Sequence, residues 1–314
     1  MALNTIEYAQ VFQTQLDQAA VRDSVTGWMD ANAGQVIYSG GNTVKIPKIS
    51  MDGMANYDRS KGYTDGAVDF SYETRTMTQD RGRRFMLDAM DVDETNFVAT
   101  AGAVMGEFQR TQVIPEIDAY RLSKIASTAI SGPKADQMVK YSYTPKADVQ
   151  SFSVLREIKS GIANIRSNGY NGALVCHIED IALSELEIEM AGRLQAMTWL
   201  QGGVTTTVPS IDGVALIATP SNRMVTSITI YDGKTSGQEK GGFTAASDAK
   251  HINFEIMPVE TPIAVSKQDV LRIFDPQTNQ QANAWSMDYR RYHDLWVKDN
   301  AASSIYVNIK EAKA

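Results

Sequence analysis

The sequence predicts a mixed α+β fold, and three observations support this class. Alternating apolar and polar residues indicate strands at 44–49 and 68–77, and strand-like patterns return between 252 and 309. Apolar residues at three- and four-residue steps predict a long helix over 93–127. Hydrophobic residues make up 43% and charged residues 21% of the 314 residues, a globular balance that excludes a wholly disordered chain.

The first 40 residues are predicted to form an arm rather than a domain. Their apolar residues are sparse, and a short amphipathic helix around 5–20 would not bury a core by itself. The N-terminus has no basic region followed by an apolar core, so we expect no secretory signal. No window approaches the roughly 20 apolar residues that a membrane span needs, so no membrane partner is expected.

The two strands after the arm predict a projecting hairpin. A polar, glycine-containing stretch at 52–62 begins the connection between them, and Pro47 argues against a central position in a sheet. A two-stranded hairpin alone is marginally stable in water. We therefore expect this hairpin to pack on something else, and another copy of the same chain is one possibility.

The helix over 93–127 is the strongest secondary-structure signal of the sequence. Asp93 or Thr95 is suited to cap its start. A helix of about 35 residues spans about 52 Å at 1.5 Å per residue. Pro115 lies inside it and is expected to kink or interrupt it, because proline removes one backbone hydrogen bond.

The second half of the chain alternates helices and strands before it returns to strands alone. Helices are predicted at 148–167 and 181–197, and 232–249 is predicted to be a surface loop. The aromatic-rich stretch 284–300 is interpreted as a packed core seam. Strands are predicted at 172–178, 204–208, 213–218, 226–231, 252–257, 263–265, 270–274 and 305–309.

No motif of the sequence predicts catalysis, a cofactor or a metal site. Asp91, Asp93 and Thr95 match the Asp-x-Asp-x-Thr string of phosphate-transferring hydrolases, but capping of the following helix explains them better. Residues 233–235 (GKT) resemble the end of a phosphate-binding loop, yet Ile228 stands where its first glycine belongs. The single cysteine, Cys176, excludes an internal disulfide and is interpreted as core packing.

One dense basic cluster occupies 80–84 (DRGRR). Three interpretations were weighed: a phosphate contact, ion pairs with the neighbouring acids Asp88, Asp91 and Asp93, or pairing between subunits, for which arginine is well suited. Thirty basic residues against 37 acidic ones leave a net charge of −7, which argues against a nucleic-acid grip. Pairing between subunits is therefore favoured.

The order of these parts resembles one known family. The most characteristic stretches are 80–85 (DRGRRF), 112–120 (QVIPEIDAY), 211–214 (IDGV), 269–276 (DVLRIFDP) and 292–296 (YHDLW). They are similar to the major capsid proteins of tailed bacteriophages, in particular those of phages and prophages of low-GC Gram-positive hosts. The resemblance covers nearly the whole chain and implies the tailed-phage major capsid fold.

The resemblance also implies how the chain is divided. It places an N-terminal arm at 1–40, an E-loop hairpin at 41–80 and a P-domain with its spine helix at 81–145. An A-domain is implied at 146–250, and 251–314 contribute the return strands of the P-domain and the C-terminus.

By the same resemblance, the expected function is structural rather than enzymatic. Hexamers and pentamers of this chain would form an icosahedral shell that encloses packaged double-stranded DNA without sequence-specific binding. The protein is expected in the virion capsid, and in the host cytoplasm during assembly. A portal protein is an implied partner. A separate scaffolding protein is expected too, because the chain begins almost at its arm.

The candidate inter-subunit contacts lie on the hairpin and in the basic cluster. Some capsid proteins crosslink an E-loop lysine to a neighbouring subunit, but non-covalent assembly is our expectation here. The candidates are Lys45, Lys48, Tyr57, Arg59, Lys61, Arg81, Arg83 and Arg84.

Three alternatives stay open. An encapsulin, a cellular compartment that loads an enzyme, shares the fold. A metal-assisted phosphohydrolase built on Asp91, Asp93 and Thr95 is a remote alternative from another class. A tail or baseplate component is the third, and the long helix argues against it.

Overall fold

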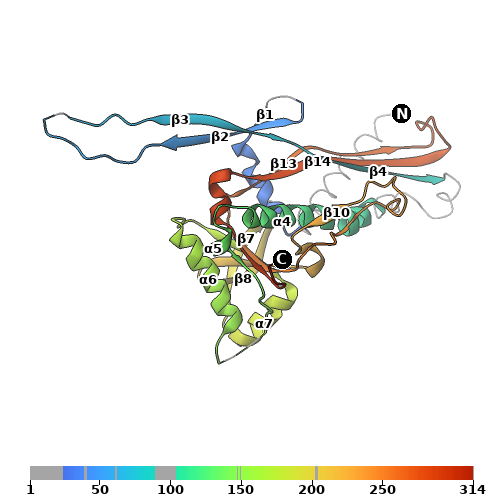
Figure 1. Cartoon of the computed structure of the whole chain (residues 1–314). Coiled ribbons are helices and arrows are strands. Elements are labelled where there is room, and N and C mark those ends of the chain that lie inside the picture. Colours follow the sequence, from blue (N-terminus) through green and yellow to red (C-terminus); the bar gives the residue numbers. More distant parts are fainter. Residues whose placement is uncertain are drawn as a thin grey trace.

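Four sheets and the helices that cover them make up the described part of the chain. In Figure 1 a projecting hairpin and a three-stranded sheet lie above a body of helices and strands. The structure is a computed structural model, and it describes residues 24–38, 41–60, 62–88, 104–146, 148, 150–201 and 204–313.

The largest sheet in this part has seven strands in the order β5-β15-β12-β6-β9-β8-β7. β6–β9 and β15–β5 are parallel pairs, and the other neighbours are antiparallel. Its strands come from both sides of residue 250, so the expected domain limits stay a prediction. The strands are β5 (Val139–Lys140), β6 (Leu174–Glu179), β7 (Gln195–Gln201), β8 (Val204–Ile211), β9 (Val214–Thr219), β12 (Ile252–Pro258) and β15 (Tyr306–Ile309).

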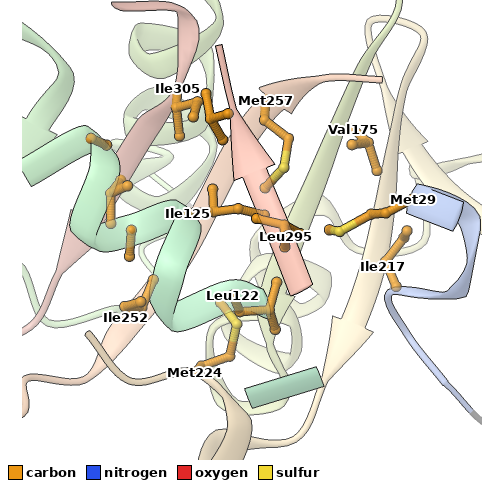
Figure 2. Packing of buried hydrophobic residues seen from close by; sticks show 14 of the residues in the cluster. Met29, Leu122, Ile125, Val175, Ile217, Met224, Ile252, Met257, Leu295 and Ile305 are labelled. Atoms are coloured by element: carbon orange, nitrogen blue, oxygen red, sulfur yellow. The ribbon is translucent and has the colours of Figure 1, made fainter. Parts of the chain in front are cut away.

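Helices cover both faces of this sheet. On one face, α6 (Ser153–Ser167) and α7 (Asp180–Met190) pack against side chains such as Cys176. On the other face, Leu122 and Ile125 of α4 (Ile114–Ile130) share a core with Val175, and Figure 2 shows this packing. Because both faces are covered, all six residues of β6 are buried, rather than every second one.

Short elements complete the body. The 3₁₀-helix η1 (Gly27–Gln35) contributes Trp28 and Met29 to the same core as α4. The others are α5 (Ala135–Met138), η3 (Ser221–Arg223), η4 (Asp299–Ser304) and the two-stranded sheet of β10 (Ile228–Ile230) and β11 (Phe243–Ala245).

The predicted long helix is confirmed from residue 104 onward, and its expected start at 93 lies outside the described residues. Residues 104–108 are helical, a π-helical turn η2 (Gln109–Val113) follows, and α4 begins just before Pro115. The expected interruption at Pro115 therefore takes the form of a wider turn directly before it. Proline has no N–H to donate to the carbonyl four residues earlier, and its ring clashes with that carbonyl in a regular α-helix. The wider π-helical turn relieves this clash.

A second sheet joins the C-terminal part of the chain to the segment after the hairpin. It has the order β13-β14-β4, from β13 (Pro262–Phe274), β14 (Ala284–Val297) and β4 (Gln79–Asp88). The strands predicted at 263–265 and 270–274 are thus one strand, with an irregularity between Ser266 and Gln268. β4 was not predicted as a strand, because its partner β14 lies about 200 residues away in the sequence.

A helix was expected at 181–197, and its predicted C-terminal end is wrong. α7 stops at Met190 because Ala191 and Gly192 have positive φ angles of 46° and 78°, which leave the helical conformation. The chain then enters β7, which pairs with β8.

Asp294 joins the base of the hairpin to the body. Its side chain is fully buried and accepts hydrogen bonds from the Thr78 N–H (2.9 Å) and hydroxyl (3.0 Å), between the hairpin and β4. It also accepts from the Tyr120 hydroxyl (2.7 Å) and the Leu295 N–H (2.7 Å), and it pairs with the Lys124 ammonium. One carboxylate thus connects the hairpin base, α4 and β14.

Two titratable side chains face each other inside the main sheet. His177 of β6 and Glu255 of β12 are directly opposite and fully buried. Trp28 Nε1 donates to His177 Nε2 (3.2 Å), and burial lowers the pKa of His177 to about 3. Burial raises the pKa of Glu255 well above its ordinary value, and neither of its oxygens has a hydrogen-bond partner within the described residues.

We predict that Glu255→Gln makes stability less dependent on pH. Burial keeps folded Glu255 protonated to a higher pH than in the unfolded chain, which ionises it above about pH 4.5. The contribution of Glu255 to stability therefore falls as pH rises, by up to about 1.4 kcal/mol per pH unit, and the variant lacks this contribution. Urea unfolding between pH 5 and 8 measures it, with Glu260→Gln on the surface as control. Equal slopes in wild type and Glu255→Gln would contradict the prediction.

We predict that Asp294→Asn loosens the base of the hairpin. The amide keeps the size but loses the charge that Lys124 pairs with, and it accepts fewer hydrogen bonds. We expect a loss of about 1–3 kcal/mol in urea unfolding and faster proteolysis near Thr78.

The matched control for this prediction is Asp299→Asn, which breaks the exposed pair with Arg75. It should cost less than about 1 kcal/mol. Similar losses for both variants would show that Asp294 has no special part in holding the hairpin.

Candidate inter-subunit surface

The predicted hairpin is confirmed as two long antiparallel strands. β2 (Thr43–Met51) pairs with β3 (Val68–Thr76) from Thr43–Thr76 to Met51–Val68, and β1 (Ile37–Tyr38) adds a short strand beside β2. In Figure 1 the hairpin projects to the left, well beyond the body. Most of its length therefore has no covering element among the described residues.

The near end of the hairpin is packed on the body through one face. Val44 and Ile46 of β2 are fully buried. They share a small core with Ile263 and Val265 of β13 and with Trp296 of β14. This core and the Asp294 hydrogen bonds hold the base of the hairpin.

The far end of the hairpin exposes apolar side chains on the opposite face. Cross-strand pairing places Ile49 beside Phe70 and Met51 beside Val68. Ile49, Met51, Val68 and Phe70 are each more than half exposed. Because side chains alternate along a strand, this face is opposite to that of Val44 and Ile46. We call it the distal apolar face; its members are Pro47, Ile49, Met51, Val68, Phe70 and Tyr72.

The other face of the same strands is polar. Ser50 pairs with Asp69, and Lys48 pairs with Ser71. Lys48 also lies 3.9 Å from Glu73. The distal part of the hairpin is therefore amphipathic, with its apolar side turned away from the side that packs on the body at the base.

The predicted contact residues of the hairpin are spread along it. Lys45 lies over the Tyr72 ring (6.0 Å), at the start of the distal apolar face. Tyr57 at the tip is exposed and contacts the Tyr63 ring (4.9 Å between centroids), and Arg59 is exposed beside it. Lys61 lies outside the described residues.

The three predicted arginines lie on β4, toward the end of the molecule opposite the hairpin tip (Figure 1). Arg81 makes two hydrogen bonds to Glu116 (2.7 and 3.1 Å), and Arg84 makes two to Asp288 (2.7 and 3.0 Å). Within the described residues, Arg83 donates only to the Glu239 carbonyl, at 3.3 and 3.4 Å. The acids that Arg81 and Arg84 contact are thus distant in sequence from 80–84.

Sequence reasoning missed two features of this surface. The distal apolar face had a usable signal, because Val68, Phe70 and Tyr72 alternate with polar residues along the strand. Asp294 had none, since its partners Thr78 and Tyr120 lie 216 and 174 residues away.

The described residues offer little for other kinds of site. No group of three His, Cys, Asp or Glu side chains among them could hold a metal ion. No helix in the same part of the chain is long and apolar enough to cross a membrane. Asp91, Asp93 and Thr95, the residues of the phosphohydrolase alternative, lie outside it.

Comparison with known proteins gives matches only at the level of structure. No protein-family model matches the sequence, and no curated protein matches it either. The capsid structure of the cyanophage P-SCSP1u matches with a TM-score of 0.56 at 11% identity, over 88% of this chain and 85% of that one.

Two further solved structures give the same result. The mature capsid of bacteriophage PhiM1 matches with a TM-score of 0.54 at 11% identity, over 87% of this chain and 83% of that one. The capsid of Staphylococcus phage Andhra matches with a TM-score of 0.52 at 12% identity, over 87% and 81%. Identities this low establish the fold alone. The described part of the chain therefore has the tailed-phage major capsid fold that its sequence predicts.

Proposed function

We propose that this chain is the major capsid protein of a tailed bacteriophage, a non-enzymatic subunit that assembles with copies of itself into a closed shell. The observation that carries the proposal is the distal apolar face. Four of its side chains, Ile49, Met51, Val68 and Phe70, are 53–71% exposed on the distal part of the hairpin. Contiguous exposed apolar patches on a projecting element are typical of protein interaction sites.

A second copy is the natural partner for this face. The hairpin leaves the body at one end, whereas the β4 arginines lie toward the other, so a contact between unlike surfaces of successive copies is favoured. Contacts between unlike surfaces generate rings when the rotation closes. Rings of five and six subunits, joined into an icosahedral shell, would then cover every hairpin.

Many weak contacts suffice for such a shell. Each chain would contribute several interfaces, and their combined effect greatly exceeds that of any single one. The predicted contact residues belong to this proposal: Lys45, Lys48, Tyr57, Arg59 and Lys61 on the hairpin, and Arg81, Arg83 and Arg84 on β4. Arg81 and Arg84 are also paired within the chain, so their part in a contact between subunits would add to those pairs.

The proposed content of the shell is double-stranded DNA, held without sequence-specific contacts. A net charge of −7 suits a container through which the packaged polymer slides better than a surface that grips phosphates. The proposed partners are a separate scaffolding protein during assembly in the host cytoplasm and a portal protein in the finished virion capsid.

We predict that a charge on the distal apolar face prevents assembly. Phe70→Asp places a carboxylate where an apolar contact with a second copy is expected. The free energy needed to desolvate this carboxylate would exceed the free energy gained from the contact. Ser71→Asp is the matched control, because it adds the same charge one residue later on the opposite, polar face. Electron microscopy and sedimentation of each protein, expressed with its neighbouring genes, measure the outcome.

Wild type and Ser71→Asp should form closed shells or rings of five and six, and Phe70→Asp should stay unassembled but folded. Assembly of Phe70→Asp at the wild-type level would remove the distal apolar face from the proposal. A wild-type protein that stays monomeric under all conditions would overturn the shell itself.

A further inference from the structure

A cavity of about 230 Å³ lies between β4, the helical residues 108–117 and the loop 231–242. One wall is apolar and includes Phe85, Phe108 and Val113. The remaining walls carry charged and polar side chains. We call this space the β4 cavity.

Two of the cations in the β4 cavity are neutralised within the chain. Arg81 is paired with Glu116 at 2.7 Å, and its remaining nitrogen donates to the Tyr231 carbonyl (2.8 Å). Arg291 is paired with Asp269 at 3.0 Å. These two ion pairs contribute little net charge to the cavity.

Two other cations have no acidic partner among the described residues. Within this part of the chain, Arg83 makes only the two long hydrogen bonds to the Glu239 carbonyl, and Lys240 forms no ion pair. The carboxylate of Asp232, which also lines the cavity, is already engaged. It accepts from the N–H groups of Lys234 and Thr235, both at 2.8 Å. Four cations line the cavity, against the carboxylates of Glu116 and Asp232 and that of Asp269 paired with Arg291, which leaves an excess of one positive charge.

A buried imidazole also lines the cavity. His293 lines the β4 cavity and is 3% exposed, and its Nδ1 has no hydrogen-bond partner in the described part of the chain. Burial lowers the pKa of His293 well below its ordinary value, and the positive charges of Arg291, Arg121, Lys124 and Arg81 lower it further. The imidazole therefore adds no positive charge to the lining at neutral pH.

The loop that covers the cavity is shaped to approach Arg83. Gly233 and Gly241 have positive φ angles of 73° and 68°, and a Cβ at either would lie 3.3 or 3.4 Å from Arg83 Nη1. Glycine at both positions lets the loop close over the guanidinium without displacing it. The loop contains the sequence GKT, but the N–H groups of Lys234 and Thr235 already donate to Asp232. They are therefore not free to bind a phosphate as in a nucleotide-binding loop, and side chains must bind any ligand here.

We propose that the β4 cavity binds one oxyanion of the phosphate class. Arg83 and Lys240 would supply both the positive charge and the hydrogen-bond donors. Charge-assisted hydrogen bonds from guanidinium and ammonium groups to such oxygens are among the strongest that side chains make. The apolar wall excludes water from one side, which strengthens these interactions.

Equilibrium dialysis of the purified full-length chain against labelled inorganic phosphate at low salt tests the proposal. One phosphate per chain should bind, with a dissociation constant below about 1 mM. Arg83→Met should weaken binding about tenfold or more, and Lys240→Met severalfold, since each removes a charged donor. Lys234→Met is the matched control, because Lys234 lies in the same loop but does not line the cavity. It should bind phosphate like the wild type.

Two outcomes would overturn the proposal: no saturable binding of phosphate, or equal weakening in all three variants, which would show a general charge effect. A short DNA duplex added as competitor identifies the source of the oxyanion. Displacement of phosphate by the duplex, lost in Arg83→Met, would indicate a nucleic-acid phosphodiester. An unchanged phosphate affinity would indicate the free ion. Either result supports an oxyanion site, and neither depends on whether the protein forms a shell.

Discussion

The burial of helix α4 is the constraint on which the rest of the structure depends. Its apolar side forms the core with the main sheet, so its polar residues are also withdrawn from water and must find partners. They find them in three segments: Asp118 and Arg121 bind 24–30, Glu116 binds β4, and Lys124 binds β14. The pairing of these buried groups is what joins the separate parts into one body.

The hairpin follows the opposite rule. Its base is fixed by buried side chains and by the carboxylate of Asp294, whereas its far half leaves an apolar face in water. The body is held by many internal contacts, whereas the hairpin is held only at its base. This arrangement suits a subunit whose hairpin is covered by neighbouring subunits. The proposed contact therefore depends on the total apolar area of the distal apolar face rather than on one particular side chain.

The sequence predicted the features that depend on neighbouring residues. The hairpin strands, α6, β6 and the helix from 104 onward follow from periodicity, because one buried face imposes a spacing of two or of three to four residues. Arg83 and Arg84 were singled out by their density, but their partners were not found. Asp288 lies 204 residues from Arg84, and no local pattern encodes such a pair.

By itself, then, the sequence determined the α+β class, most of the elements and the presence of a projecting hairpin, since short-range patterning is sufficient for each. Only the tertiary structure decided that 79–88 is a strand, that α7 ends at Met190, and that Asp294 clamps the hairpin. It alone placed Arg83 and His293 around one cavity. These outcomes rest on hydrogen bonds and charges brought together from distant positions, and such contacts exist only once the chain has folded.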